Sequence, residues 1–224
     1  IEAFGEKALR TLAIAYKRVG DDKPDDAADH EEDIVLVGIH GIMDPPRPEV
    51  PAAVAEAESA GVRTVMITGD HAVTAEAIAE QIGIKHSDAQ TVHTGAEIDT
   101  LSDRQLQDTV KHAAVFARVT PEHKLRIVNA MQANGEVAAM TGDGVNDAPA
   151  LRSADIGVAM GIAGTSVAKD SASLVLLDDN FSTIVTAVRE GRRIYDNLLK
   201  FIRQGLTANV AEVSAILFAF LLMG

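Results

Sequence analysis

Short apolar runs alternate with amphipathic stretches through the middle of the chain, and this pattern predicts its fold. Runs with the length of buried strands lie at residues 62–67, 114–117, 137–140, 156–160 and 174–177. Stretches of helical character lie between them at residues 49–60, 73–82 and 120–134, and a further helix begins at Ser102. Each of the three bounded stretches is followed by a glycine, a frequent helix terminator. Strands that alternate with helices predict an α/β domain with a parallel sheet and helices on its faces.

The beginning of the chain has a different pattern. A helix is expected over residues 2–9 and a strand over 11–19, followed by an acidic run at 21–33 with eight Asp or Glu against one Lys. Such a run predicts a solvated linker. The compact apolar run at residues 34–39 predicts another buried strand, whereas the polar and poorly patterned residues 86–100 predict a loop.

The end of the chain reads as one long helix. From residue 181 the apolar positions follow a helical period with no Pro, and residues 205–224 contain no Lys or Arg. A helix needs about 20 apolar residues to cross a bilayer. A basic cluster precedes this span and predicts a cytoplasmic position for the preceding helix: Arg189, Arg192, Arg193, Lys200 and Arg203. The alternative is a C-terminal helix buried in a soluble protein.

Composition narrows the possible functions. Hydrophobic residues make up 47% of the chain but aromatics only 4%, which suits parallel strands and their covering helices. The net charge of −13 argues against a nucleic-acid partner. The absence of cysteine excludes disulfides, thiol catalysis and thiolate metal sites, and the seven histidines are scattered rather than clustered. With no initial Met and no signal peptide, the chain is expected to be a piece of a longer protein.

Candidate chemistry is concentrated in residues 141–151, TGDGVNDAPAL, which follow the predicted strand at 137–140. This segment places Asp143, Asn146 and Asp147 on a turn with two glycines, at the strand end where α/β sheets carry their sites. Asp143 and Asp147 supply carboxylate oxygens, which are ligands that Mg²⁺ prefers, and both are candidate ligands of this metal. An ordinary acidic turn would account for one Asp and one Gly, but not for the whole string.

Two further groups belong with this loop. Thr68, Gly69 and Asp70 follow the strand at 62–67 and offer a hydroxyl and backbone N–H groups to phosphate oxygens. Lys124 lies in the first turn of the helix at 120–134, where it can act as a point charge on a phosphoryl group. Taken singly, Thr-Gly-Asp is a common turn and a helical Lys is usually a solvated charge.

The order Thr, then Lys, then Gly-Asp-x-x-x-Asp resembles the haloacid dehalogenase superfamily, and most closely its P-type ATPase branch. The segments MITGD at 66–70, FARVTPEHK at 116–124 and TGDGVNDAPAL at 141–151 are similar to that branch's phosphorylation-domain signatures. DPPR at 44–47, LDDNFSTI at 177–184 and GRRIY at 191–195 are similar to further family segments. The resemblance covers residues 34–212 and favours the type II cation pumps, which include calcium, sodium/potassium and proton/potassium ATPases. It implies a Rossmannoid parallel sheet with flanking helices, followed by a long stalk and transmembrane helix.

The resemblance also implies roles. Asp143 would ligand Mg²⁺, and Asp147 would hold the metal site and Lys124 in register. Asn146 would hydrogen-bond the phosphate, Lys124 would neutralise its charge, and Thr68 and Gly69 would donate to its oxygens. Four residues would shape the ATP side of the site and the hinge beside it: Asp70, Arg118, Asp44 and Arg47.

The expected organisation follows from the same resemblance. Residues 1–33 would be the tail of a nucleotide-binding domain and its linker, 34–180 a cytoplasmic phosphorylation domain, 181–204 a stalk helix, and 205–224 the start of the fifth transmembrane helix. Within that helix Asn209 and Glu212 are three residues apart and share a face. Polar groups inside a bilayer usually mark an ion pathway. This pair resembles a calcium-binding segment, although sodium and proton pumps carry a related acid.

One family feature is missing. The nucleophilic Asp of the family's D-K-T-G-T motif does not occur in the 224 residues, nor does the D-x-D-x-T/V pattern of soluble phosphatases. Without a carboxylate nucleophile no aspartyl-phosphate forms, so the chain by itself is expected not to turn over ATP. Two alternatives are a soluble Mg²⁺-dependent phosphatase of the same superfamily and a binding module that keeps a Mg²⁺/phosphate pocket without a nucleophile.

Overall fold

The structure, a computed structural model, describes residues 9–18, 33–42, 45–87 and 89–223. It divides into two compact units with the boundary between Asp179 and Asn180. The first unit carries the strands and all helices but one, and the second carries the long helix α9 (Phe181–Met223).

The first parallel sheet is built around a fully buried strand. Its strand order is β3-β5-β4, with bounds Met66–Ile67, Ala113–Ala117 and Thr91–Thr94. Met66 pairs with Val115, and every residue of β5 is buried. Phe116, the fourth residue of β5, has no exposed surface, so the central strand is as buried as its apolar sequence predicts.

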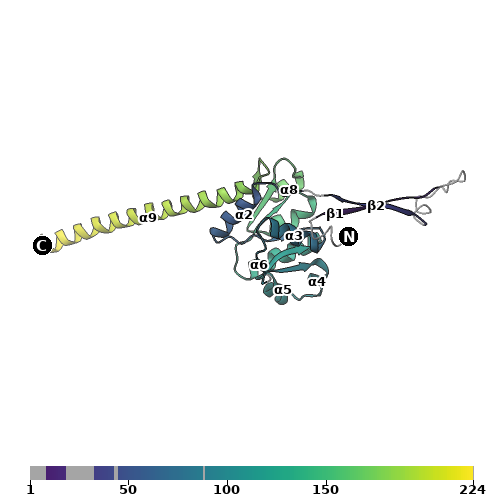
Figure 1. Ribbon diagram of the computed structural model, residues 1–224. Coiled ribbons are helices and arrows are strands. Elements are labelled where there is room, and N and C mark those ends of the chain that lie inside the picture. Colours follow the sequence, from purple (N-terminus) through teal and green to yellow (C-terminus); the bar gives the residue numbers. More distant parts are fainter. Residues whose placement is uncertain (1–8, 19–32, 43–44, 88, 224) are drawn as a thin grey trace. The chain divides into compact units, whose positions relative to one another are not determined.

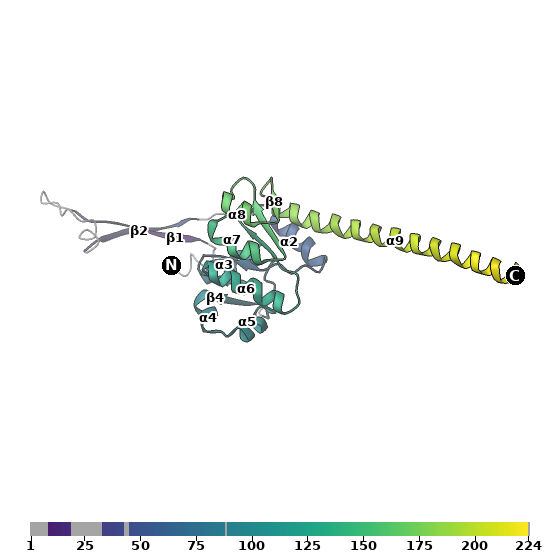
Figure 2. The ribbon, with the colours of Figure 1, turned by 180° about the vertical axis from the view of Figure 1, so that it is seen from behind.

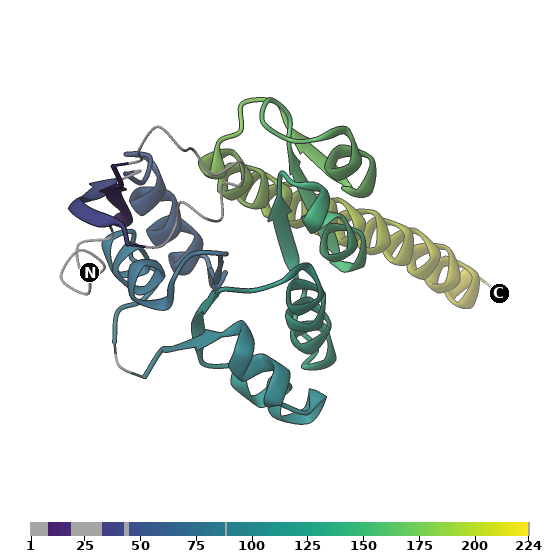
Figure 3. The ribbon, with the colours of Figure 1, turned by 90° about the vertical axis from the view of Figure 1, so that its right-hand side faces the viewer.

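The second parallel sheet has the order β6-β7-β8, with bounds Ala139–Gly142, Ile156–Met160 and Leu174–Leu176. The short helices α7 (Ala148–Ser153) and α8 (Ser166–Ser171) pack against β7 and against each other. Figure 2 shows the two helices side by side, and Figure 3 shows this green part of the chain from another direction.

Longer helices connect and cover these strands. They are α2 (Val50–Ser59), α3 (Ala72–Gln81), α5 (Asp103–Thr109) and α6 (Pro121–Ala133). The glycines after α2, α3 and α6 adopt the left-handed φ that such helix ends require: Gly61, Gly83 and Gly135. Ile67 and Met131 pack against both hydrophobic clusters of the unit, one around Phe116 and one around Leu151. The two sheets therefore share a continuous apolar contact.

The prediction of a loop at residues 86–100 is wrong. Within this range lie β4 and the helix α4 (Gly95–Thr100). Thr94 caps α4 by accepting from Glu97 N, while the Glu97 carboxylate accepts from Thr94 N. A four-residue edge strand and a six-residue helix are too short for a visible period, and the pairing of β4 with β5 decides the strand.

The buried parallel strand predicted at 34–39 is also wrong. Residues Val35–Ile42 form β2, which pairs antiparallel with β1 (Arg10–Tyr16) in a two-stranded sheet. Val35, Leu36 and Val37 are 53%, 59% and 64% exposed. An apolar strand is buried only where another layer covers it, which sequence pattern alone cannot supply.

Several predicted bounds shift. β3 is confined to Met66–Ile67, and β6 begins at Ala139, where its pairing with β7 begins, while Val137 before it is 78% exposed. The helix predicted at 2–9 and the linker at 21–33 lie, apart from their last residues, outside the described residues.

The second unit is a single uninterrupted helix, α9, of 43 residues (Figure 1). At ~1.5 Å per residue it extends about 65 Å. It is long and apolar enough to cross a membrane, with a window of mean hydropathy 1.9. Large apolar side chains project into solvent along it, among them Val213, Leu217, Phe218, Phe220 and Leu221.

Candidate functional site

Asp147 is the centre of the loop that follows β6. It ends the short 3₁₀ helix η2 (Val145–Asp147) and is buried, at 6% exposure. One carboxylate oxygen accepts from Lys124 Nζ at 2.5 Å. The other accepts from the backbone N–H groups of Asp143 at 3.3 Å and Gly144 at 3.1 Å. Asp147 thus fixes the loop backbone and holds the lysine at the same time.

Gly142 permits this close loop. A β-carbon at this position would lie 2.5 Å from Asp147 Cβ and 2.8 Å from its Cγ. Both contacts are much shorter than any real carbon–carbon contact, so a side chain here would push Asp147 away from its partners. The glycine is required by the approach of Asp147 rather than by a positive φ.

Lys124 reaches the loop from α6. The sequence prediction of a helix start at Thr120-Pro121 is confirmed, with the Thr120 hydroxyl as cap and Pro121 in the first turn. Lys124 N donates to Thr120 O at 3.2 Å, so the lysine lies in the first turn of the helix. Its side chain is 19% exposed, against 8% for that of Asp147. The ion pair is therefore largely withdrawn from solvent screening.

Thr68 lies at the carboxyl end of β3. Its N–H donates to Phe116 O at 2.9 Å, and its own carbonyl accepts from Val119 N at 3.3 Å. Its hydroxyl forms a local turn with Asp70, donating to the carboxylate at 3.0 Å and accepting from Asp70 N at 3.1 Å. A β-carbon at Gly69 would meet nothing within 4 Å, so the backbone of the turn is open to a ligand.

Arg118 and Arg47 both donate hydrogen bonds to backbone carbonyl groups in this structure. Arg118 is exposed, has a left-handed φ of 50° and donates its N–H to Asp70 O at 3.0 Å. A non-glycine residue in this region stores strain and is typical of functional turns. Arg47 donates to Asp179 O at 2.7 Å. Asp44, the other residue expected on the ATP side, lies outside the described residues.

Asp143 and Asn146 are exposed at the tip of the loop, and Asp143 O accepts from Thr165 N at 2.8 Å. Among the described residues no group of three or more His, Asp or Glu could hold a metal by itself. Mg²⁺ needs fewer, since it is usually held by one or two carboxylates together with water and substrate phosphates. Because both Asp147 oxygens are already engaged, the donor set fits Mg²⁺ with Asp143 as the direct ligand.

The structure brings the predicted residues into two groups. Lys124, Asp147 and Asp143 are joined around the β6 loop, and Thr68, Asp70 and Arg118 are joined around the end of β3. Ile67, the neighbour of Thr68, packs against the hydrophobic clusters on both sides. Asn209 and Glu212 lie in the other unit, on exposed turns of α9.

Asp179 has a structural role that the sequence did not indicate. It is buried, with a left-handed φ of 50°. Its carboxylate accepts from Ile162 N at 3.0 Å and from Ala163 N at 2.7 Å, and these bonds lower the pKa of Asp179 below the usual range of Asp. The next segment of the Ile162 loop carries Thr165, which is bonded to Asp143. No spacing rule links residues 179 and 162, so the sequence offered no signal for this contact.

Comparison with known proteins agrees with this geometry. Residues 3–155 match the haloacid dehalogenase-like hydrolase family. The chain is 52% identical to a calcium-transporting ATPase of Bacillus subtilis over 98% of its length, which is 24% of that protein. It is 50% identical to calcium-transporting ATPase 1 of Lactococcus lactis over 97% of its length, or 25% of that protein. It is 51% identical to the probable cation-transporting ATPase F of Mycobacterium tuberculosis over 97% of its length, or 24% of that protein. The chain thus spans about a quarter of these relatives.

Proposed function

Because the chain belongs to the haloacid dehalogenase-like hydrolase family, we propose that it supplies part of the phosphoryl-transfer site and one ion-pathway helix of an ATP-driven cation pump, with Ca²⁺ as the favoured ion. The observation that carries this proposal is the Lys124–Asp147 ion pair at the carboxyl end of β6. It places a fixed cation and a fixed loop where α/β sheets bind their ligands.

The roles of the site residues follow from their bonds. Lys124 neutralises charge on the transferred phosphoryl group, and Asp147 holds both Lys124 and the loop backbone in place. Asp143 is the Mg²⁺ ligand, and Asn146 and Gly69 N–H donate to phosphate oxygens. The bound metal would neutralise developing charge on the phosphoryl oxygens. Phosphoryl transfer is mainly positioning and electrostatic stabilisation, which suits a site built from fixed charges and amides.

The proposed Asp nucleophile would be carried by a further parallel strand that is not among the described strands of this chain. β3 pairs with β5, and β6 pairs with β7; among the described residues neither β3 nor β6 has a second partner. The two strands that carry Thr68 and the Asp143 loop at their carboxyl ends therefore each have an edge for a further parallel strand. A strand between them would place its own carboxyl-terminal Asp between the phosphate donors and the metal ligand.

The ion pathway is assigned to α9. This helix is long and apolar enough to cross a bilayer, and Asn209 and Glu212 lie on one face of it. We propose that α9 lies in a membrane and that the α/β unit is cytoplasmic, where ATP is available. The relatives named as calcium-transporting favour Ca²⁺ over other cations, and they disfavour a soluble phosphatase because the similarity continues through α9.

The test uses the intact protein that contains this chain, reconstituted in vesicles. Phosphorylation from ATP that is acid-stable and sensitive to hydroxylamine is expected, together with Ca²⁺ uptake. Asp143→Asn should reduce both by about 100-fold or more, the scale of a lost electrostatic stabiliser. Glu212→Gln should abolish the Ca²⁺ dependence of phosphorylation, and Asp170→Asn, an exposed acid on α8, should change neither.

Three results would each contradict a part of the proposal. If the intact protein forms no phosphoenzyme, the assigned reaction is wrong. If Ca²⁺-dependent phosphorylation is unchanged in Glu212→Gln, Glu212 is not an ion ligand. Phosphorylation of the 224-residue chain alone would show that the nucleophile lies within it.

A further inference from the structure

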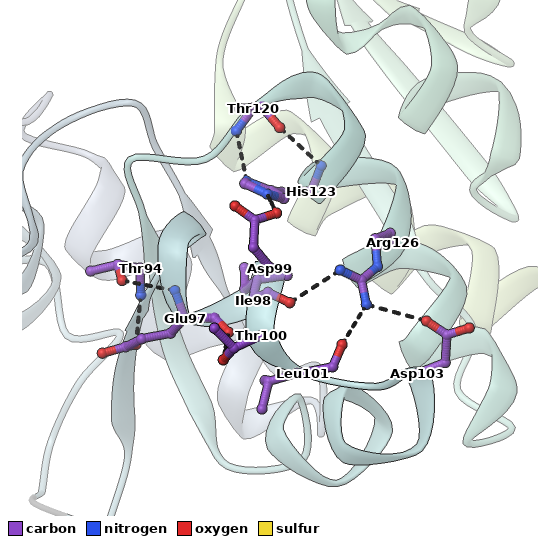
Figure 4. A network of polar contacts seen from close by, with 10 residues as sticks. All are labelled: Thr94, Glu97, Ile98, Asp99, Thr100, Leu101, Asp103, Thr120, His123 and Arg126. Atoms are coloured by element: carbon purple, nitrogen blue, oxygen red, sulfur yellow. Dashed lines mark hydrogen bonds and ion pairs between the residues drawn. The ribbon is translucent and has the colours of Figure 1, made fainter.

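The first turn of α6, which carries Lys124, is closed by an unusual partner. His123 is buried at 5% exposure, and its Nδ1 accepts from Thr120 N at 3.0 Å while His123 N donates to the Thr120 hydroxyl at 3.4 Å. This is a capping box in which the third helical residue, normally Glu or Gln, is a histidine (Figure 4).

The contacts of the ring determine its tautomer. A backbone N–H can only donate, so Nδ1 must carry a lone pair and the proton of the neutral ring lies on Nε2. Nε2 in turn lies 2.7 Å from Asp99 Oδ1 on α4, which accepts that proton's hydrogen bond. Asp99 accepts from Nε2–H whether the imidazole is neutral or charged. A second proton on the ring would therefore be carried by Nδ1, where it would face the Thr120 N–H and remove the acceptor of that bond.

The ring is held closely on the α4 side. A β-carbon at Gly95 would lie 2.7 Å from His123 Nδ1 and 2.4 Å from Arg118 O. Only glycine lets α4 approach the ring and the β5–α6 turn at once. Other ionisable groups lie on the elements around the ring: His93, Glu97, Arg118, Glu122, Lys124 and Arg126. Within the part of the chain that the structure describes, Asp99 is the ionisable partner bonded to the imidazole.

We infer that His123 is a positioning residue for Lys124: its neutral imidazole closes the first turn of α6 and so holds the lysine against Asp147. This inference rests on the role proposed for Lys124 in phosphoryl transfer. Lys124 directly follows His123 and donates its N–H to Thr120 O, the carbonyl of the residue that His123 caps. When the cap opens, the first turn frays, and the 2.5 Å contact from Lys124 Nζ to Asp147 loses its support.

The two other capping boxes nearby show what the histidine adds. Thr94 is paired with Glu97, and Ser102 with Gln105, both ordinary acceptors. Of these three boxes, the one beside the phosphate lysine is the one whose acceptor is an imidazole nitrogen, which can accept from Thr120 N only while Nδ1 carries no proton.

Arg126 provides a matched control on the same helix. It donates to Ile98 O at 3.1 Å and to Leu101 O at 2.9 Å, and so also ties α6 to α4 (Figure 4). Its guanidinium does not titrate, and it lies outside the first turn. Loss of Arg126 weakens the same helix contact without changing the cap.

The experiment uses the whole 224-residue chain in detergent micelles. The first measurement is the ¹⁵N NMR signal of the His123 ring, for which a bare Nδ1 and a protonated Nε2 are expected at neutral pH. The second is the affinity for inorganic phosphate with Mg²⁺ at one neutral pH, compared among wild type, His123→Gln, His123→Ala and Arg126→Gln. Gln keeps the acceptor of a capping box, so it should restore the binding that Ala loses.

Wild type and His123→Gln should bind phosphate equally, and His123→Ala should bind it about five-fold more weakly, the scale of a lost helix cap. Arg126→Gln, which leaves the cap intact, should bind phosphate as tightly as wild type. A protonated Nδ1 at neutral pH, or a phosphate affinity of His123→Ala equal to that of wild type, would overturn the inference.

A failure of the proposed function would look different. If no variant binds phosphate, the phosphate site is wrong, and the Lys124 ammonium NMR signal then decides the inference. That signal should show an ion-paired lysine in wild type and His123→Gln at neutral pH, and lose it in His123→Ala. An ion-paired signal in all three would exclude a positioning role for His123.

Discussion

The α/β unit and helix α9 use the same kinds of side chain in opposite ways. Phe116 and Ile127 have no exposed surface, whereas Phe218 and Phe220 on α9 are 65% and 76% exposed. Burial of a large apolar side chain stabilises by about 1.5–3 kcal/mol, so the first pair contributes to folding of its unit and the second does not. An apolar residue in the sequence indicates that its side chain needs an apolar environment. Only the structure shows whether the protein's own core provides that environment.

The largest expected effect on stability comes from comparing one buried and one exposed phenylalanine. Phe116→Ala should lower the free energy of unfolding of the α/β unit by about 3–5 kcal/mol because it leaves a cavity in a fully packed strand. Phe218→Ala should leave that free energy unchanged and weaken association with lipid vesicles. Hydrogen exchange of the β5 amides with increasing urea measures the first effect, and vesicle flotation measures the second. Equal loss of stability in both variants would show that α9 belongs to the folded core.

A smaller effect separates two glycines. Gly142→Ala should destabilise the α/β unit by about 1–3 kcal/mol, since its new β-carbon overlaps Asp147 and forces the loop apart. Gly205→Ala on α9 meets nothing within 4 Å and should stabilise its helix by about 0.5–1 kcal/mol. The same exchange measurement, with circular dichroism for α9, gives both signs. A neutral Gly142→Ala would mean that Asp147 has room to move.

The Gly142→Ala variant also bears on the site. Displacement of Asp147 should release Lys124 and reduce Mg²⁺-dependent phosphate binding, whereas Gly205→Ala should not. Unchanged phosphate binding in a destabilised Gly142→Ala chain would separate the loop from the proposed chemistry.

The smallest effect concerns pH and compares two acids. The amides of Ile162 and Ala163 lower the pKa of Asp179, so this carboxylate stabilises the folded unit above the pKa that it has when unfolded, about 3.9. That stabilisation is lost as pH falls through the lower folded value. Asp179→Asn should therefore be less stable than wild type at pH ~7, and the difference should shrink below about pH 4. Asn tolerates the left-handed backbone of this position, and it removes the charge together with one of the two acceptor oxygens.

Glu212→Gln on α9 is the matched control for this pair. It should not change unfolding of the α/β unit at any pH, because Glu212 is exposed in the other unit. Urea midpoints at a series of pH values test both variants. A difference for Asp179→Asn that persists unchanged to pH ~2 would rule out its charge as the cause.

Much of the fold was predictable where the signal is local. The helix start at Thr120-Pro121 and the helix ends at Gly61, Gly83 and Gly135 depend on contacts within one or two turns of chain. The strand at Ile156–Met160 pairs with distant strands, but its own compact apolar run was enough to predict it. The long helix α9 follows the same rule, because an uninterrupted helical period needs no partner to be recognised. Residues 86–100 failed because β4 and α4 are too short to show a period.

The candidate site divides along the same line. The amino-acid sequence by itself determined which residue types stand at strand ends, and so selected Thr68, Lys124 and Asp143 as candidates. The pairing of Lys124 with Asp147 across 23 positions was implied by the family resemblance, not by spacing, and the structure shows it as a direct contact. Only the tertiary structure decided that Asp179 binds the Ile162 loop and that β2 stays exposed. Capping and periodicity are short-range interactions that the chain carries wherever it folds. Burial and ion pairing depend on which distant segment arrives alongside, and that is set by the packing of the whole unit.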